Sequence, residues 1–334
     1  MITRWLVLAG TVWLFALAIV VGQSSRSSFP GTIDQHPAID YRGTSAADAV
    51  TRVAAGDLAF DGRQGYLRSV LAALDIPIES QVLLFSKTGI QHQFTNPQNP
   101  RALYFNDHVF VGYIPDAPFL EIASHDPRQG VIFYLLKQEP AAPPSFARAP
   151  ICLSCHLTGN TLDVPGLLVR SMFTGPEGRT MPQLGSFVVD HRNPLEQRWG
   201  GWYVTGTHGA ARHMGNAMVT DLSHPESAIG EATLNRSALD SRVDPALYPA
   251  ASSDIVALMV FDHQGRAVNL LTLLGWQTRI AQAESRLDVS TSELRDVVRD
   301  TADYLLFVDE APLAAPIVGT VVQEILGDTL TGWR

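Results

Sequence analysis

The only two cysteines of this 334-residue chain lie within five residues, Cys152-Leu153-Ser154-Cys155-His156. Disulfide bonds within the chain therefore cannot join distant segments, and the fold has to come from the burial of an apolar core. Apolar residues make up 46% of the chain, which supports a large core and excludes disordered and collagen-like chains. A net charge of −9 argues against nucleic acid as a partner.

The spacing C-x-x-C-H predicts covalent attachment of one haem c. Two thiols three residues apart can each add to one vinyl group of the haem, and the histidine after the second cysteine is then placed to bind the iron. A redox pair of cysteines needs no histidine, and a zinc site would need further cysteines or well-spaced histidines. We therefore expect Cys152 and Cys155 to hold the haem and His156 to be an iron ligand.

The N-terminus has the pattern of an export element. Residues 5–22 are apolar or small and carry no charge, and Arg4 precedes them. This length lies between a signal-peptide core and a short spanning helix, so cleavage and retention in the membrane both stay open. We expect residues 1–24 to be a signal or membrane anchor, residues 25–44 a linker, and residues 45–334 a periplasmic haem c domain. The protein would then lie on the inner membrane facing the periplasm, or free in the periplasm if the signal is cleaved.

The remaining pattern predicts an α+β protein. After the N-terminal membrane helix we expect a large irregular domain of short strands around a c-type haem, flanked by helices. Helical periodicity covers residues 45–58, 65–74, 255–262, 267–286 and 292–308. Short strands are predicted over residues 81–85, 102–104, 109–113, 131–136, 167–173 and 185–189. Residues 157–220 are rich in glycine, proline and aromatic residues, so we expect them to form an irregular shell.

The ligand on the second face of the iron would decide the function. The candidates are Met172, Met181, His191, His208, His213, Met214 and Met218. Met214 as ligand would raise the reduction potential and suit electron transfer, whereas His213 would give a site of lower potential. If neither binds, His208 or His213, together with Arg212, could form an acid–base and charge-stabilising pair for a bound oxygen species.

Two arginines and a tryptophan are candidates for the wall of the site. Arg170 and Arg198 could pair with haem propionates, because a guanidinium contacts a carboxylate through two parallel hydrogen bonds. Trp202 lies in an aromatic segment that could pack against the macrocycle. An ordinary aromatic core with surface arginines explains the same pattern, so both interpretations stay open.

Six segments of the chain carry a resemblance to known proteins. They are residues Asn99–Asp107, Cys152–His156, Val164–Ser171, Arg198–Gly209, Ser253–Met259 and Tyr304–Phe307. Together they resemble a family of exported bacterial proteins described only as cytochrome c domain-containing, over roughly residues 80–315. The resemblance implies haem and export but no substrate. The small cytochrome c fold, by contrast, is matched only at C-x-x-C-H.

Three functions are compatible with this sequence. The first is electron transfer by a monohaem cytochrome with a periplasmic or membrane redox partner. The second is a haem enzyme of the peroxidase or oxidase kind with an open iron, and the third is a haem-bearing sensor or assembly module. A single haem favours the first, because a peroxidase must draw electrons from a donor or second centre. The length of the chain favours the second, since electron transfer alone needs a much smaller domain.

Overall fold

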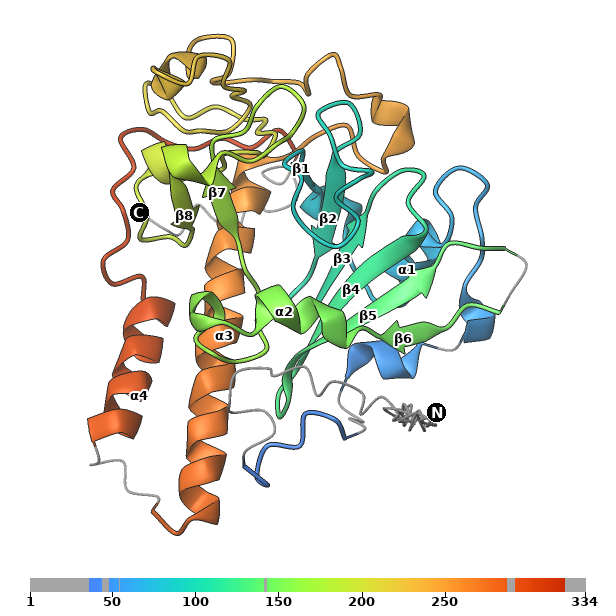
Figure 1. Cartoon of the computed structure of the whole chain (residues 1–334), viewed down its shortest axis with the longest axis vertical. Helices are drawn as coiled ribbons and strands as arrows, with labels where there is room; N and C mark the ends of the chain where they lie inside the picture. Colours follow the sequence, from blue (N-terminus) through green and yellow to red (C-terminus); the bar gives the residue numbers. More distant parts are fainter. Residues whose placement is uncertain (1–35, 44–47, 54, 141–142, 287–291, 322–334) are drawn as a thin grey trace, which may run out of the picture.

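The computed structural model describes residues 36–43, 48–53, 55–140, 143–286 and 292–321. The predicted membrane segment, residues 5–22, lies outside these ranges. Within them, no helix combines the length and the apolar character that a membrane span requires. Within the described residues, the predicted fold class is wrong in its large irregular domain of short strands. The scaffold is an α+β arrangement around a regular antiparallel sheet (Figure 1).

Six strands form the main sheet. They are β1 (Val82–Leu84), β2 (Arg101–Phe105), β3 (Val109–Tyr113), β4 (Phe119–Asp126), β5 (Gly130–Lys137) and β6 (Phe146–Arg148). Each strand pairs antiparallel with the next along the chain, so the sheet is a meander joined by local connections. The sequence pattern misses β4 because Glu121, Ser124 and His125 interrupt its apolar residues. In the structure buried residues alternate regularly along this strand.

Four α-helices accompany the sheet. They are α1 (Leu67–Ala73), α2 (Leu153–His156), α3 (Ile255–Ala283) and α4 (Ser292–Leu305). The helices predicted over 255–262 and 267–286 are one continuous helix, α3, whose first turn is capped by the carboxylate of Asp254. In the segment predicted as a helix over 45–58, the described residues form short 3₁₀ turns instead of an α-helix.

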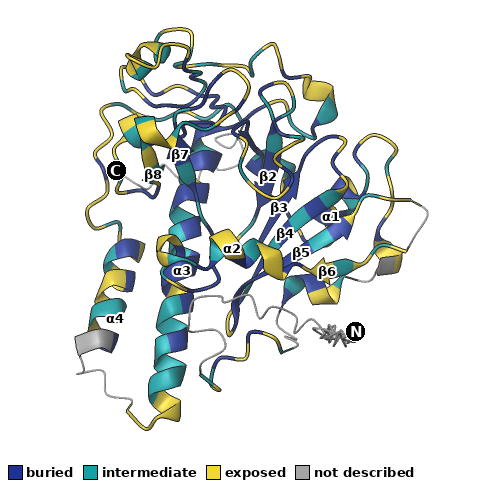
Figure 2. Ribbon diagram, in the orientation of Figure 1, coloured by how far each residue is buried: buried dark blue, intermediate teal, exposed yellow. Residues whose placement is uncertain are grey.

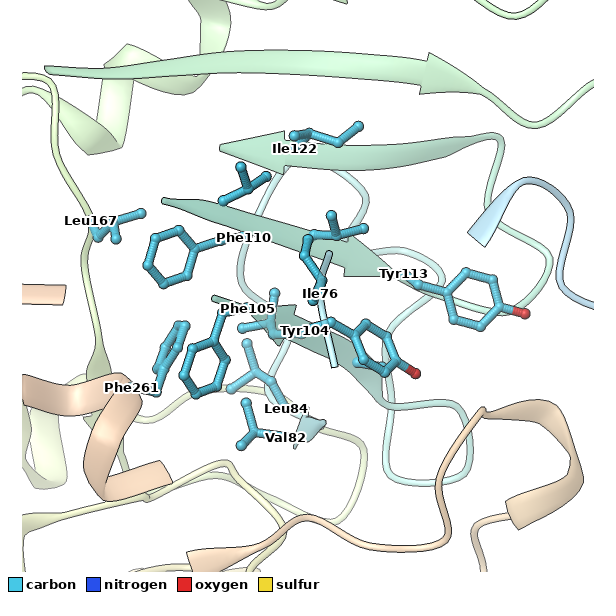
Figure 3. Packing of buried hydrophobic residues seen from close by; sticks show 14 of the residues in the cluster. Ile76, Val82, Leu84, Tyr104, Phe105, Phe110, Tyr113, Ile122, Leu167 and Phe261 are labelled. Carbon is cyan, nitrogen blue, oxygen red and sulfur yellow. The ribbon is translucent and has the colours of Figure 1, made fainter. Parts of the chain in front are cut away.

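One face of the sheet packs against α3 through aromatic rings. The register aligns Phe105, Phe110, Ala123 and Phe133 across β2 to β5, so their side chains lie on the same face. Phe261 of α3 lies 5.2 Å from Phe105 and 5.8 Å from Phe110 between ring centroids (Figure 3). One part of the core therefore sits between the sheet and the first turns of α3, which are largely buried (Figure 2).

Between α2 and α3 the chain contains only short regular elements. These include the two-stranded sheet of β7 (Arg170–Met172) and β8 (Ser186–Val188), with several 3₁₀ turns. This region still has a buried interior, since Trp199 and Tyr203 are almost completely inaccessible to solvent. Its neighbour on the main sheet is β1, because Leu84 pairs with Trp202 in an isolated β-bridge.

Candidate functional site

The C-x-x-C-H motif lies in the segment that follows the short edge strand β6 and runs beside β5. The amide of Ala149 donates to the carbonyl of Phe133 at 2.8 Å, and the amide of Val131 donates to the carbonyl of Pro165 at 2.9 Å. The segment from Ala149 to Pro165, which carries the motif, is thus hydrogen-bonded to β5 at both of its ends, at Phe133 and at Val131. This segment consists of a 3₁₀ turn over Pro150–Cys152, the short helix α2 and a turn. Both ends of the motif segment are therefore fixed to the same strand.

The two thiols are free and differ in their environment. Cys152 is half-buried against the core, whereas Cys155 is exposed. Burial raises the pKa of the Cys152 thiol to about 11, and the negative charge of Glu121 adds to this. Catalytic redox pairs rely on a thiol of lowered pKa, so this environment does not favour a thioredoxin-like role. Two free thiols on one turn of chain do fit the covalent attachment of a haem.

His156 is held in one defined orientation. Its Nδ1 lies 2.9 Å from the carbonyl oxygen of Gly166, and the amide of Gly166 donates to the carbonyl of His156 at 2.9 Å. A carbonyl only accepts, so Nδ1 carries the proton and Nε2 presents a lone pair. Burial lowers the pKa of the imidazole, which keeps it neutral, and its ring packs against Phe133 with centroids 4.8 Å apart. Metal-binding histidines are commonly oriented in this way by a backbone carbonyl.

Asn269 of α3 fixes the segment that orients His156. Its side chain accepts from the amide of Leu167 and donates to the carbonyl of Leu167, both at 2.7 Å. It also packs so closely over Gly166 that a Cβ at this position would collide with its Oδ1. The sequence analysis missed this residue. A polar side chain within the apolar stretch Ala267 to Leu274 is the signal that points to it.

The predicted sixth ligands have their contacts elsewhere. Met214 is buried, and its Sδ accepts from the hydroxyl of Ser171 at 3.5 Å. His213 is also buried, with its Nδ1 accepting from the amide of Gly215 at 3.0 Å and its ring 5.4 Å from that of Trp199. Burial lowers the pKa of His213 to about 3. These contacts lie within the region between α2 and α3, whereas the ring of His156 packs on Phe133 of β5.

The two residues of the predicted acid–base pair, His208 and Arg212, have different partners. The ring of His208 lies against that of His213, with centroids 4.6 Å apart, and its Nε2 accepts from the amide of Asn235 at 3.1 Å. Arg212 is exposed and donates to the carbonyl of Ile229 at 2.7 Å. The structure therefore gives His208 a packing role and directs Arg212 to a surface loop.

The predicted wall residues also have backbone partners. Arg198 is buried, and its guanidinium donates to the carbonyls of Asn193 and His191. It holds a loop in place through these bonds. The indole Nε1 of Trp202 donates to the carbonyl of Arg170 at 2.9 Å, which connects the segment after β8 to β7. The side chain of Arg170 donates to the hydroxyl of Ser186 on the paired strand.

The residues present fit a haem held through the C-x-x-C-H motif. Among the described residues, no group of three or more histidine, cysteine or carboxylate side chains is arranged to hold a bare metal ion. His156 alone offers one imidazole nitrogen, so an iron bound there requires further donors, which a porphyrin supplies. The free thiols of Cys152 and Cys155 lie on the same turn to attach it.

Comparison with protein-family models, with curated proteins and with solved structures finds no match for this chain. The functional interpretation therefore depends on the motif and on its surroundings in the fold.

Proposed function

We propose that this chain is an exported monohaem c-type protein that carries electrons between partners on the periplasmic side. Cys152 and Cys155 hold the haem through thioether bonds, and His156 binds its iron through Nε2. When bound, the haem supplies a centre that takes up and releases one electron. The residues of the chain position this centre and set its environment.

The single observation that carries this proposal is the geometry of His156. Its Nδ1 is engaged by the carbonyl of Gly166, its ring is packed on Phe133, and its pKa is lowered by burial. The imidazole is therefore neutral, of one tautomer and fixed in orientation, as an axial ligand must be. The exposed thiol of Cys155 directly precedes this histidine, and a purely structural role of His156 does not explain that thiol.

A haem enzyme with an open coordination position is the second candidate. The observation that favours it is the engagement of Met214 by Ser171 and of His213 by Gly215. Both predicted sixth ligands thus have partners within the region between α2 and α3. If no side chain fills the second axial position, small molecules would bind to the iron there.

An optical spectrum of the purified protein with and without carbon monoxide separates these two functions. Electron transfer with both axial positions filled predicts a low-spin spectrum that carbon monoxide does not change. An open iron predicts a high-spin ferric spectrum and a shifted ferrous carbon monoxide spectrum. Absence of covalent haem in protein made together with a haem-attachment system would contradict both functions.

A further inference from the structure

An ion pair lies on the sheet face that carries Phe133. Arg101 of β2 and Glu121 of β4 are in contact, with Nη2 2.5 Å from Oε2, and their side chains are 19% and 13% exposed. The second carboxylate oxygen of Glu121 accepts from the side chain of Gln91 at 2.9 Å. The pair is thus half-buried and geometrically fixed, unlike a loose surface pair.

Gly112 lets this ion pair form across an intervening strand. It lies on β3, between the strand of Arg101 and the strand of Glu121, and pairs directly with Glu121 in the register. A Cβ on Gly112 would lie 2.9 Å from both Nε and Nη2 of Arg101. The guanidinium therefore crosses β3 over the one residue there that has no side chain. A glycine is needed here because the side chain of Arg101 lies where a Cβ would be, and not because of a turn in the backbone.

The register places the ion pair close to the haem-attachment motif. Glu121 pairs with Leu135, and the next rung on the same face joins Ala123 to Phe133, against which the ring of His156 packs. Successive side chains on one face of a strand are about 7 Å apart. Cys152 also lies within the electrostatic influence of the ion pair. Burial is the largest cause that raises the pKa of its thiol, and in addition the charge of Glu121 raises this pKa while that of Arg101 lowers it.

The hydrogen bond of His156 Nδ1 is directed toward one end of β5. Nδ1 is directed to Gly166, and the preceding Pro165 is bonded to Val131, two residues before Phe133. The ion pair lies at the opposite end of this stretch, where Glu121 pairs with Leu135. Nε2 is on the far side of the ring from Nδ1, so it faces away from Gly166.

A largely buried ion pair beside the aromatic residues of this face needs a reason beyond stability. Removing two charges from water costs free energy that their attraction does not generally exceed. The other face of the same strands buries Leu120, Ile122 and Leu136 without such a pair. A charged pair next to a redox centre can shift the reduction potential of that centre, since nearby charge and burial are among the influences that a protein has on it.

We propose that the charges of Arg101 and Glu121 set the reduction potential of the group bound at His156. The inference rests on the proposed function, because it requires haem at the motif. A positive charge near the iron favours the ferrous state and a negative charge favours the ferric state. The two residues therefore act on the potential in opposite directions, and the balance between their charges sets its value.

The test is a redox titration of the full-length protein with covalent haem, followed by optical spectroscopy. We expect Arg101→Gln to lower the midpoint potential and Glu121→Gln to raise it. The double variant should lie between the two single variants. Glu139→Gln is the matched control, because Glu139 forms an exposed ion pair with Lys137 after the end of β5. Its midpoint potential should equal that of the unmodified protein.

Equal potentials for Glu121→Gln and Glu139→Gln, at equal haem content, would overturn the inference while leaving the proposed function intact. If Arg101→Gln does not fold, Glu121→Gln still decides, because its amide oxygen can accept the hydrogen bond from Gln91. The haem content of each protein is measured separately from its pyridine complex. An unmodified protein without covalent haem would overturn the proposed function, and this inference with it.

Discussion

Nδ1 of His156 lies 2.9 Å from the carbonyl oxygen of Gly166, ten residues further along the chain. This bond fixes the tautomer and the orientation of the imidazole at the end of the C-x-x-C-H motif. The carbonyl that accepts it is fixed in turn by Asn269, which holds the backbone of Leu167 from α3. The motif, β5 and α3 therefore form one structural unit.

Asn269→Leu tests this unit. The variant leaves the amide and the carbonyl of Leu167 without their partner, and an unsatisfied buried polar group costs about 1–3 kcal/mol. We expect the free energy of unfolding in urea to fall by that amount and the spectrum of bound haem to change. The control is Gln282→Ala, at an exposed position near the end of the same helix. A stable variant with an unchanged spectrum would show that Asn269 does not position His156.

Cys155→Ala tests the attachment of the haem. The exposed thiol of Cys155 is expected to form one thioether bond, so its loss should lower the amount of haem that stays with the polypeptide in acidic acetone. Ser154→Ala is the control because Ser154 lies between the cysteines and carries no thiol; its hydroxyl donates to the carbonyl of Ile151 at 2.8 Å and makes only a long contact of 3.9 Å with Sγ of Cys155. Equal retention of haem in both variants would contradict a thioether bond at Cys155.

Met214→Leu tests the predicted sixth ligand. Because the Sδ of Met214 already accepts from Ser171, we expect the ferric spectrum to stay unchanged. The similar volume of leucine should keep the loss of stability below about 1.5 kcal/mol. Conversion from a low-spin to a high-spin spectrum would show instead that Met214 binds the iron and that this region rearranges when haem is present.

The stability of the protein should depend on pH through His191. Burial, assisted by the neighbouring His263, lowers the pKa of His191 from 6.5 to about 4. Between these values the unfolded chain takes up a proton that the folded chain does not, so stability is retained above pH 6.5 and falls as the pH decreases toward 4. The expected contribution between pH 7 and pH 5 is about 2 kcal/mol.

Urea unfolding at pH 7 and pH 5 measures this contribution. His191→Asn should reduce the loss of stability between the two pH values by about 2 kcal/mol. His224→Asn is the control, since the ring of His224 is exposed and pairs only with Asp221 at the surface. The same pH dependence in His191→Asn and in the unmodified protein would show that other groups cause it.

Much of the scaffold could be predicted from local pattern. Runs of apolar residues located four of the six strands of the main sheet, β1, β2, β3 and β5, to within one residue at each end, and missed β4 and β6. In β4 the alternation is hidden by Glu121. This residue lies on the sheet face that packs against α3, where it pairs with Arg101 across β3. Such a pair depends on the register of three strands, which no short segment reveals. The two helices that merge into α3 were separated in the prediction because the polar stretch after Phe261 interrupts the apolar pattern.

The site was predictable only at the motif itself. C-x-x-C-H is a local signal, and it designates Cys152, Cys155 and His156 directly. The residues that support His156 are distant in sequence, since Asn269 lies on a helix more than a hundred residues away. Density of histidine and methionine drew attention to His213 and Met214, but their burial with Trp199 is a tertiary property.

The most direct test of the central claim is the state of the haem in the unmodified protein. The chain is produced with a haem-attachment system, unfolded in acidic acetone, and examined by mass spectrometry and by the spectrum of its pyridine complex. We predict a polypeptide heavier by the mass of one haem, with a thioether-type spectrum. The haem should be found on the peptide that contains Cys152 and Cys155. A polypeptide of unmodified mass with two free thiols would contradict the account.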